Sequence, residues 1–385
     1  MERHTHAPRD DWEKKVEDVG LRHHTAGGVP YWHEEAHYTF RLDQVYRIEN
    51  ATRELHRLCV EAAEAVIRDK RYAELAIPPR AVPLIEQSWE ADAPSLYGRF
   101  DFSYDGTGEP RMLEYNADTP TSLVEAAVAQ WFWLEERFPG GDQFNRLHEA
   151  LVETWTELKP HLLDPTVHFA AIDDVEDEST ILYLRDTAEQ AGLRTVQLRV
   201  QDIGWDGARF VDVDGAEIRC IFKLYPWEWM LGEEFGGHLA RTAGNVQWME
   251  PAWKMILSNK GILPILWERS PGHPNLLPAY RDEFMFRQGV DAYVAKPLLS
   301  REGANVRIVS PWHPTAASGG DYGEEGFVYQ EYAPLPELDG QRPVIGSWII
   351  GQEPAGMGIR ESVGPITDNL SRFVPHRIVN PLRER

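Results

Sequence analysis

The chain has 385 residues and a formal charge of −23, from 62 acidic and 39 basic residues. A chain this acidic lacks the general positive surface with which proteins bind nucleic acid, so any lysine or arginine inside a pocket would be notable. Apolar residues make up 42% of the sequence, which is typical of a globular protein. The length exceeds one simple core and predicts two or three lobes.

Nothing in the sequence predicts a membrane or secreted protein. Residues 1–15 are polar and lack the apolar segment of a signal peptide. No apolar run approaches the roughly 20 residues that a membrane helix needs. The two cysteines, Cys59 and Cys220, lie in no metal-binding spacing, which favours buried thiols in a reducing compartment. We therefore expect a cytoplasmic protein without membrane or nucleic-acid partners, whose oligomeric state the sequence does not indicate.

The N-terminal third begins with a polar, histidine-rich segment. Residues 1–28 contain four histidines, namely His4, His6, His23 and His24. We expect a frayed terminus, because a metal-binding histidine tract would need carboxylates at a supporting spacing. The next segment, residues 39–70, has apolar side chains at helical spacing and predicts a scaffold helix.

Residues 99–116 predict a β-hairpin. In the first strand Arg99, Asp101 and Ser103 alternate with aromatic side chains, which is a period of two. Residues 105–108 read Asp-Gly-Thr-Gly, a turn sequence. The second strand is expected over residues 111–116.

This hairpin predicts a metal site. A loop centred near residues 107 and 108 places Asp101 opposite Glu114, with Asn116 two residues further along the same face. Like charges directly opposite each other destabilise a sheet, whereas two carboxylates and an amide oxygen suit Mg²⁺. The alternative is a surface hairpin with solvated charges, and the aromatic residues around the polar ones argue against it.

The hairpin leads into a helix. Residues 118–121 predict a turn, and a helix is expected over residues 123–137. Ser122, followed three residues later by Glu125, is a capping-box pattern. The free N–H groups of such a helix end can face an anionic ligand.

The middle of the chain predicts a small α/β unit. Helices are expected over residues 143–159 and 181–191, and strands over residues 167–172 and 195–200. A hairpin is expected over residues 209–224, around Asp-Gly at 214–215. Lys223 opens a segment in which a lysine and a glutamate stand among aromatic residues, which we interpret as a pocket wall.

The acidic run over residues 173–178 has two interpretations. Acidic side chains at the start of a helix favour its dipole. Alternatively, Glu176 or Asp177, just after the carboxyl end of a strand, contacts a cationic or amine group of a substrate. Both interpretations stay open.

The last third predicts a phosphate site. Lys260 precedes an apolar run, and Lys296 lies at the end of a strand over residues 291–297. A glycine-containing loop at residues 298–305 and a returning strand at 306–309 follow, an arrangement suited to a lid over phosphates. Taken alone the motif is weak, because lysines often end strands.

Three further strands are expected, over residues 327–334, 343–351 and 356–361. The first ends at a polar hinge whose backbone groups can meet an adenine edge. The third carries Arg360, whose planar fork suits a transferring phosphoryl group. Glu361, the nearest acid in sequence, points to the opposite face, so we expect Arg360 to lack a local ion-pair partner.

Together these motifs resemble the synthetase domain of the glutathionylspermidine synthase family, which has an ATP-grasp fold. The resemblance covers about residues 10–380. No single motif is specific, but the set is. The segments that carry it are 99–101 (Arg-Phe-Asp), 114–122, 258–260 (Ser-Asn-Lys), 295–297 (Ala-Lys-Pro), 330–331 (Gln-Glu) and 358–360 (Gly-Ile-Arg).

The resemblance implies roles for individual residues. The implied Mg²⁺ ligands are Asp101, Glu114 and Asn116. The implied ATP contacts are Arg99, Lys260, Lys296 and the hinge residues Gln330, Glu331, Tyr332 and Ala333. The implied catalytic residues are Arg99 at the phosphates and Arg360 at the transferring phosphoryl group. The implied substrate contacts are Thr119, Glu176, Asp177 and Lys223.

The sequence departs from the family in two places. Bifunctional members carry an N-terminal Cys/His amidase domain, which is not seen here, so hydrolysis of the product is not expected. The lid loop reads Leu-Leu-Ser-Arg-Glu-Gly at residues 298–303. The family often has a smaller and more basic loop there, so phosphate contacts of the lid are not carried over.

The sequence thus predicts an α/β (α+β) protein: an ATP-grasp fold with a preceding α/β substrate-binding domain. Residues 1–165 are expected to form a helical region with the metal-binding hairpin, residues 166–255 a substrate lobe, and residues 256–385 the nucleotide lobe.

The predicted function is ATP-dependent, ADP-forming ligation of a small-molecule carboxylate to an amine through an acyl phosphate, with ATP and Mg²⁺ as cofactors. A thiol peptide and a polyamine are the family's examples of such substrates. The alternatives are an ATP-grasp peptide or amino-acid ligase with another acceptor, and a non-catalytic nucleotide-binding protein.

Overall fold

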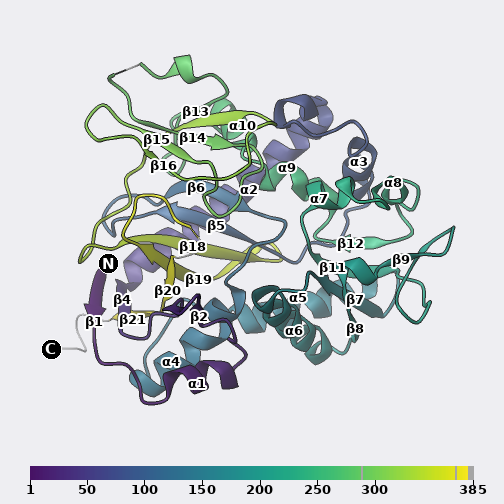
Figure 1. The fold of residues 1–385 in the computed structure, drawn as a ribbon, viewed down its shortest axis with the longest axis horizontal. Helices are drawn as coiled ribbons and strands as arrows, with labels where there is room; N and C mark the ends of the chain where they lie inside the picture. The colour runs from purple at the N-terminus through teal and green to yellow at the C-terminus, as the bar shows by residue number, and fades with distance from the viewer. Residues whose placement is uncertain (288, 369–370, 380–385) are drawn as a thin grey trace.

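The computed structural model describes residues 1–287, 289–368 and 371–379 (Figure 1). Its centre is a five-stranded antiparallel sheet in the order β20-β19-β18-β5-β6. The strands are β5 (Tyr97–Ser103), β6 (Arg111–Asn116), β18 (Arg342–Ile350), β19 (Glu353–Ser362) and β20 (Arg372–Val374). The predicted hairpin and the predicted Arg360 strand therefore belong to one sheet, although more than 200 residues separate them in sequence.

The hairpin is not a surface feature. Every residue of β5 is buried. Helix α2 (Leu42–Arg68) packs against the central sheet, where the Thr52 hydroxyl lies 2.7 Å from that of Ser347 on β18. The predicted long helix is confirmed, except that its first residues belong to β4 (Ala36–Arg41).

The prediction of a frayed N-terminus is wrong. Strand β1 (Glu2–Thr5) pairs with β4, which also pairs with β21 (His376–Val379) near the end of the chain. Helix α1 (Trp12–Asp18) and the short strands β2 (Thr25–Ala26) and β3 (Val29–Pro30) follow. Arg9 forms a buried ion pair with Glu34, at 2.7 Å. The polar composition hid this packing because the partners of the segment lie far away in sequence.

The middle of the chain forms a four-stranded parallel sheet in the order β12-β11-β7-β8. Its strands are β7 (Thr166–Ala171), β8 (Arg194–Arg199), β11 (Cys220–Leu224) and β12 (Gln247–Met249). Helices α5 (Leu147–Leu158) and α6 (Val175–Gln190) pack on each other beside this sheet (Figure 1). The α/β unit is confirmed, with α6 beginning six residues before the expected start.

The hairpin expected over residues 209–224 is largely wrong. Strand β10 (Phe210–Val211) pairs with β9 (Gly204–Trp205), and Val211 meets Glu217 in a single bridge. Strand β11 instead runs parallel between β7 and β12, and all five of its residues are buried. A short, fully buried apolar run is typical of an inner parallel strand.

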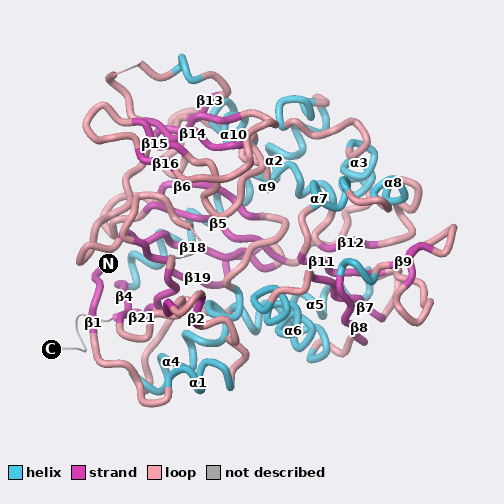
Figure 2. The backbone as a smooth tube through the Cα atoms, in the orientation of Figure 1, coloured by secondary structure: helices cyan, strands magenta, loops and turns pink. Residues whose placement is uncertain are grey.

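The last third contributes a second five-stranded antiparallel sheet, in the order β13-β17-β14-β15-β16 (Figures 1 and 2). Its strands are β13 (Ala279–Tyr280), β14 (Tyr293–Pro297), β15 (Arg307–Val309), β16 (Ala316–Ala317) and β17 (Phe327–Glu331). Helix α10 (Ile262–Arg269) packs against β13 and β17. The strands expected over residues 291–297 and 306–309 are confirmed.

The other helices are short: α3 (Val82–Glu90), α4 (Gln130–Arg137), α7 (Trp227–Gly232), α8 (Gly236–Leu239) and α9 (Met255–Ser258). A π-helical turn, Glu125–Ala129, precedes α4. The expected capping box does not form, because the Ser122 hydroxyl bonds Tyr31 and the Glu125 carboxylate bonds His23. No described helix is both long and apolar enough to cross a membrane. The division into three segments at residues 165 and 255 and the cytoplasmic location stay predictions.

Candidate active site

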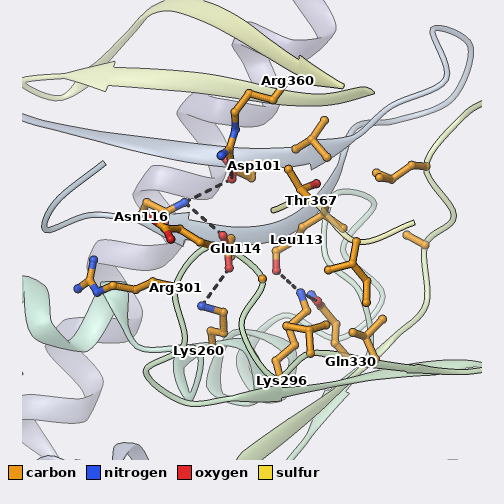
Figure 3. Close-up of a pocket in the computed structure, with 18 of the residues that line it drawn as sticks. Asp101, Leu113, Glu114, Asn116, Lys260, Lys296, Arg301, Gln330, Arg360 and Thr367 are labelled. Atoms are coloured by element: carbon orange, nitrogen blue, oxygen red, sulfur yellow. Dashed lines mark hydrogen bonds and ion pairs between the residues drawn. The ribbon is translucent and has the colours of Figure 1, made fainter. Parts of the chain in front are cut away.

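One pocket gathers side chains from both antiparallel sheets (Figure 3). Strands β5, β6 and β19 of the central sheet form one wall, and β14, β15 and β17 form the facing wall. Its lining includes every residue expected to hold metal or nucleotide, and one expected substrate contact: Arg99, Asp101, Glu114, Asn116, Thr119, Lys260, Lys296, Gln330, Glu331, Tyr332, Ala333 and Arg360.

The candidate metal ligands lie where the hairpin register was expected to place them. Asp101 and Glu114 are directly paired across β5 and β6. The Asn116 amide nitrogen lies 3.4 Å from a carboxylate oxygen of each. The nitrogen and oxygen of a side-chain amide are interchanged by a flip about its last torsion, so Asn116 can equally present its oxygen to a cation. Two carboxylates and an amide oxygen fit Mg²⁺.

Three cations balance these carboxylates. Arg99 donates two hydrogen bonds to Asp101, at 2.7 and 3.1 Å. Arg360 Nη2 lies 3.5 Å from the same carboxylate, and Lys260 Nζ lies 3.1 Å from Glu114. The expectation that Arg360 lacks a local partner is therefore wrong, because β18 places Asp101 of β5 within its reach.

The opposite face of β19 behaves as expected. Glu361 is fully buried and accepts hydrogen bonds from Arg3 at 2.8 Å, Tyr38 at 2.7 Å and Arg372 at 3.0 Å. Its neighbour Arg360 therefore faces the pocket without competition from Glu361.

Burial shapes the charges of the pocket. Burial raises the pKa of Glu114, but the nearby Lys260 and Lys296 outweigh it and bring the pKa of this carboxyl well below its usual range. Burial also lowers the pKa of Lys296 to about 8, against the opposing influence of Glu114. An anionic ligand beside Lys296 would favour its charged form and raise this pKa again.

Lys296 and the hinge connect the two walls. Lys296 Nζ donates to the Gln330 side chain at 2.7 Å and to the Leu113 carbonyl on β6 at 2.9 Å (Figure 3). The Glu331 and Tyr332 backbone N–H groups are already bonded, to the carbonyls of Pro278 and Ala292. An adenine edge would therefore meet the hinge through its carbonyls or through Ala333.

The lid loop supplies a pocket residue that the motifs did not single out. Arg301 donates to the Thr119 hydroxyl at 2.6 Å and to Glu228 at 2.8 Å. Its neighbour Glu302 also lines the pocket, as does Thr367 near the end of the chain. The sequence signal that could have identified Arg301 was an arginine within a glycine-containing loop between two strands. Its distance in sequence from Thr119 concealed the contact.

Three expected substrate contacts lie outside the pocket lining. Lys223 is 1% exposed and pairs with the buried Asp118 at 2.6 Å, and Asp118 also accepts the Trp227 N–H. Any influence of Lys223 on a substrate would therefore pass through the turn that carries Thr119.

Glu176 and Asp177 occupy the first turn of α6. Asp174 caps this helix by accepting the backbone N–H groups of both. Burial, then the charge of Glu125, raises the pKa of Glu176. Burial, then the charge of Glu176, raises the pKa of Asp177 to about 7. Both the helix-dipole interpretation and the substrate-contact interpretation of these two carboxyls stay predictions.

Comparison with known proteins identifies the family to which the chain belongs. The family model described as glutathionylspermidine synthase preATP-grasp matches residues 3–379. The chain belongs to the glutathionylspermidine synthase family. This membership makes it an ATP-dependent ligase with the ATP-grasp fold.

Several named proteins of the family are similar to this chain. A Haemophilus influenzae protein named "Putative acid--amine ligase" is 42% identical, over 98% of this chain and 100% of that protein. Trypanothione synthetase of Crithidia fasciculata is 32% identical, and the bifunctional glutathionylspermidine synthetase/amidase of Escherichia coli K12 is 28% identical, each over 84% of this chain. The chain spans 54% and 56% of the length of these two larger enzymes.

Proposed function

We propose that this protein joins a small-molecule carboxylate to an amine by way of an acyl phosphate, with Mg²⁺-ATP as the energy source. The proposal rests on one observation: candidate metal ligands and cationic side chains line the same pocket. Asp101, Glu114 and Asn116 offer oxygen ligands, and four cations surround them, namely Arg99, Lys260, Lys296 and Arg360. Metal and triphosphate charges are complementary to these two sets.

The facing walls suggest how ATP lies. Adenine fits beside the hinge, at Tyr332 and Ala333, and the triphosphate extends past Lys296 toward Glu114. Asp101, Glu114 and Asn116 would hold Mg²⁺, which neutralises phosphate charge and fixes phosphate geometry when bound. Asp101 now neutralises Arg99 and Arg360, and a cation at Asp101 would free both arginines for phosphate oxygens.

Residues of the chain then stabilise the charge that develops during the reaction. A substrate carboxylate oxygen attacks the γ-phosphorus, and the bond to ADP breaks. Arg99 and Arg360 stabilise the charge on the transferring group through charge-assisted hydrogen bonds. The amine next attacks the acyl carbon, and phosphate leaves with the bonding electrons. This route needs no covalent protein nucleophile.

The amine substrate would bind at a second part of the site. Glu176 and Asp177 place two carboxyls in the first turn of α6, and their ionised forms would attract a cationic amine. A thiol peptide and a polyamine are substrates in the names of related enzymes and are reasonable first probes here. A non-catalytic nucleotide-binding role is the weaker alternative, because the pocket keeps a complete set of candidate metal ligands beside its cations.

The decisive experiment measures ADP release with Mg²⁺-ATP across a panel of carboxylates and amines, including glutathione and spermidine. We expect release that requires one carboxylate and one amine together. ATP binding without turnover for any pair in a broad panel would favour the non-catalytic alternative. Turnover with amino acids alone would favour a peptide or amino-acid ligase.

A further inference from the structure

Three titratable side chains from distant parts of the chain converge beside the pocket. His23 lies between α1 and β2, Glu125 begins the π-helical turn, and Glu176 lies in the first turn of α6. Their candidate ligand atoms all lie within 4.8 Å of one another. His23 Nε2 is 2.9 Å from Glu125 Oε1. Glu125 is 1% exposed and Glu176 is partly buried, so the fold holds these side chains together largely away from solvent.

The cluster adjoins the wall where the phosphoryl group would be transferred. Tyr31, whose ring lies 5.3 Å from that of His23, meets the Ser122 hydroxyl at 3.0 Å. The preceding Thr121 lines the pocket, and its carbonyl accepts a hydrogen bond from Arg99 Nη1 at 2.5 Å. The pocket residue Arg360 is close enough for its charge to lower the pKa of Glu176.

The three side chains have different electrostatic tasks. Burial disfavours ionised Glu125, but the charge of His23 and hydrogen bonds to the carboxylate together outweigh burial and lower the pKa of Glu125. In the same pair, burial lowers and Glu125 raises the pKa of His23, with a net rise. The ionised Glu125 then adds to burial in raising the pKa of Glu176. The pKa of Glu125 is thus lowered beside an imidazole whose pKa is raised, and the pKa of the second carboxyl, Glu176, is raised.

We propose that Glu176 accepts a proton from the attacking amine and that the His23–Glu125 pair tunes Glu176 for this task. The inference rests on the proposed ligase function. An alkyl amine with an unperturbed pKa near that of lysine, about 10.4, enters as an ammonium ion at neutral pH and has no free electron pair. It must lose a proton before it can attack.

The step balances as follows. The ammonium ion gives one proton to the Glu176 carboxylate, and its freed electron pair forms the N–C bond at the acyl carbon. The C–O bond to phosphate breaks, and the electron pair leaves with phosphate. The second nitrogen proton passes to the departing phosphate, leaving a neutral amide and hydrogen phosphate. Glu176 contacts the amine in this scheme, and His23 and Glu125 are positioning residues.

Several other charged groups face Glu176 and enter its titration. Glu125 belongs to the π-helical turn and His23 to the N-terminal segment. The remaining groups are Tyr31 before β4, Arg360 of β19, Glu302 of the lid loop, and Asp174 and Asp177 beside it at the start of α6.

Hydroxylamine separates this proposal from the proposed function. It is mostly unprotonated at neutral pH, so it attacks an acyl phosphate without a proton acceptor and gives a hydroxamate. We expect Glu176→Gln to lower the rate with an alkyl amine by about 10²-fold or more. Its hydroxamate formation should stay within roughly threefold of the parent. Glu178→Gln, an exposed neighbour in the same turn, is the matched control and should leave both rates unchanged.

The outcomes are distinct. If the parent protein forms no hydroxamate with any carboxylate, the proposed function fails. If Glu176→Gln loses both reactions equally, or keeps both, the ligase stands and the proton-acceptor assignment is overturned.

A pH profile tests the tuning pair. His23→Gln removes a cation and should move the acidic limb of kcat/KM for the alkyl amine to higher pH, because the pKa of Glu176 rises. Glu125→Gln removes an anion and should move the same limb to lower pH, by about half a unit in each case. Shifts in one common direction, or none, would contradict the tuning role.

Metal binding is the remaining test. An imidazole and two carboxylates can also ligate a transition metal. We expect Zn²⁺ and Mn²⁺ titrations to show no site that disappears in His23→Gln. Tight binding of one ion that His23→Gln abolishes would overturn the proposal, since Glu176 would then be a ligand and not a base.

Discussion

At the scale of single residues, Asp101 controls the active-site charges. It pairs with Arg99 at 2.7 Å and lies 3.5 Å from Arg360, so both arginines lie beside one candidate metal ligand. If Asp101 bound a metal ion in place of these arginines, the guanidinium groups of Arg99 and Arg360 would be free to contact phosphate. This exchange links metal binding to phosphoryl-group stabilisation.

Arg360→Ala should lose kcat while ATP binding survives. A bidentate contact that is made mainly in the transition state is worth several kcal/mol, so we expect a loss of roughly 10²-fold or more. Arg360→Lys should recover little, because a point charge does not reproduce the fork. Steady-state kinetics at saturating ATP and ATP titration calorimetry measure the two effects. Arg53→Ala on the surface of α2 is the control. Turnover near the parent rate in Arg360→Ala would move the role to Arg99.

Asp177→Asn should raise KM for the amine and leave that for ATP nearly unchanged. The change should also increase stability at pH 8 but not at pH 4. Burial raises the folded-state pKa of Asp177 to about 7, so ionising it costs folding free energy as pH rises through this window. The upper limit is roughly 4 kcal/mol. Thermal unfolding of both proteins at the two pH values provides the measurement, and equal stabilisation at both values would refute the ionisation argument.

At the scale of elements, the placement of the Arg99 side chain beside β18 depends on a glycine. Gly346 lies opposite Asp101 in the ladder, and a Cβ atom there would come within 2.8 Å of Arg99 Cδ. The side chain of Arg99 lies next to Gly346 of β18 where it bonds Asp101. The Arg99 side chain therefore occupies the space that a side chain at position 346 would need.

Gly346→Ala should displace Arg99 from Asp101. Overpacking of this kind costs about 1–3 kcal/mol, and we expect a loss of kcat/KM larger than this destabilisation alone would explain. Denaturant unfolding and kinetics on the folded fraction separate the two effects. The control is Gly108→Ala, where a Cβ atom would meet nothing within 4 Å. Full activity in a destabilised Gly346→Ala protein would show that Arg99 can relocate without consequence.

At the scale of the whole molecule, the nucleotide would join the two antiparallel sheets. Lys296 already bonds across them, to Leu113 on β6, and Arg301 connects the lid loop to Thr119 and Glu228. A ligand held by both walls should therefore stabilise the fold as a unit.

ATP with Mg²⁺ should raise the melting temperature much more than ATP alone. Ligand at 100 times its Kd adds about 2.7 kcal/mol to the folded state. Glu114→Gln should abolish the dependence on Mg²⁺, since it removes one candidate ligand. Differential scanning fluorimetry with and without Mg²⁺ tests both statements. Absence of any shift in both conditions, supported by a blank calorimetric titration, would exclude this pocket as the ATP site.

The sequence by itself determined the local features. Period-two alternation and an Asp-Gly-Thr-Gly turn predicted the hairpin and the pairing of Asp101 with Glu114, because a hairpin closes over few residues. The register shift between Asp101 and Phe102, on which this pairing also depends, was not predicted. Helical periodicity predicted α2, and the motif set predicted the residues that line the pocket. Each of these signals is contained in a short window of sequence.

Only the tertiary structure decided which distant segments meet. Pairing of β19, β18 and β5 gives Arg360 an acidic partner. Strand β11 pairs within the parallel sheet, although the local turn sequence had predicted it in a hairpin. The same holds for His23 and Glu125, which are 102 residues apart and bonded at 2.9 Å. Contacts of this kind depend on burial of whole faces against each other, and no local spacing encodes them.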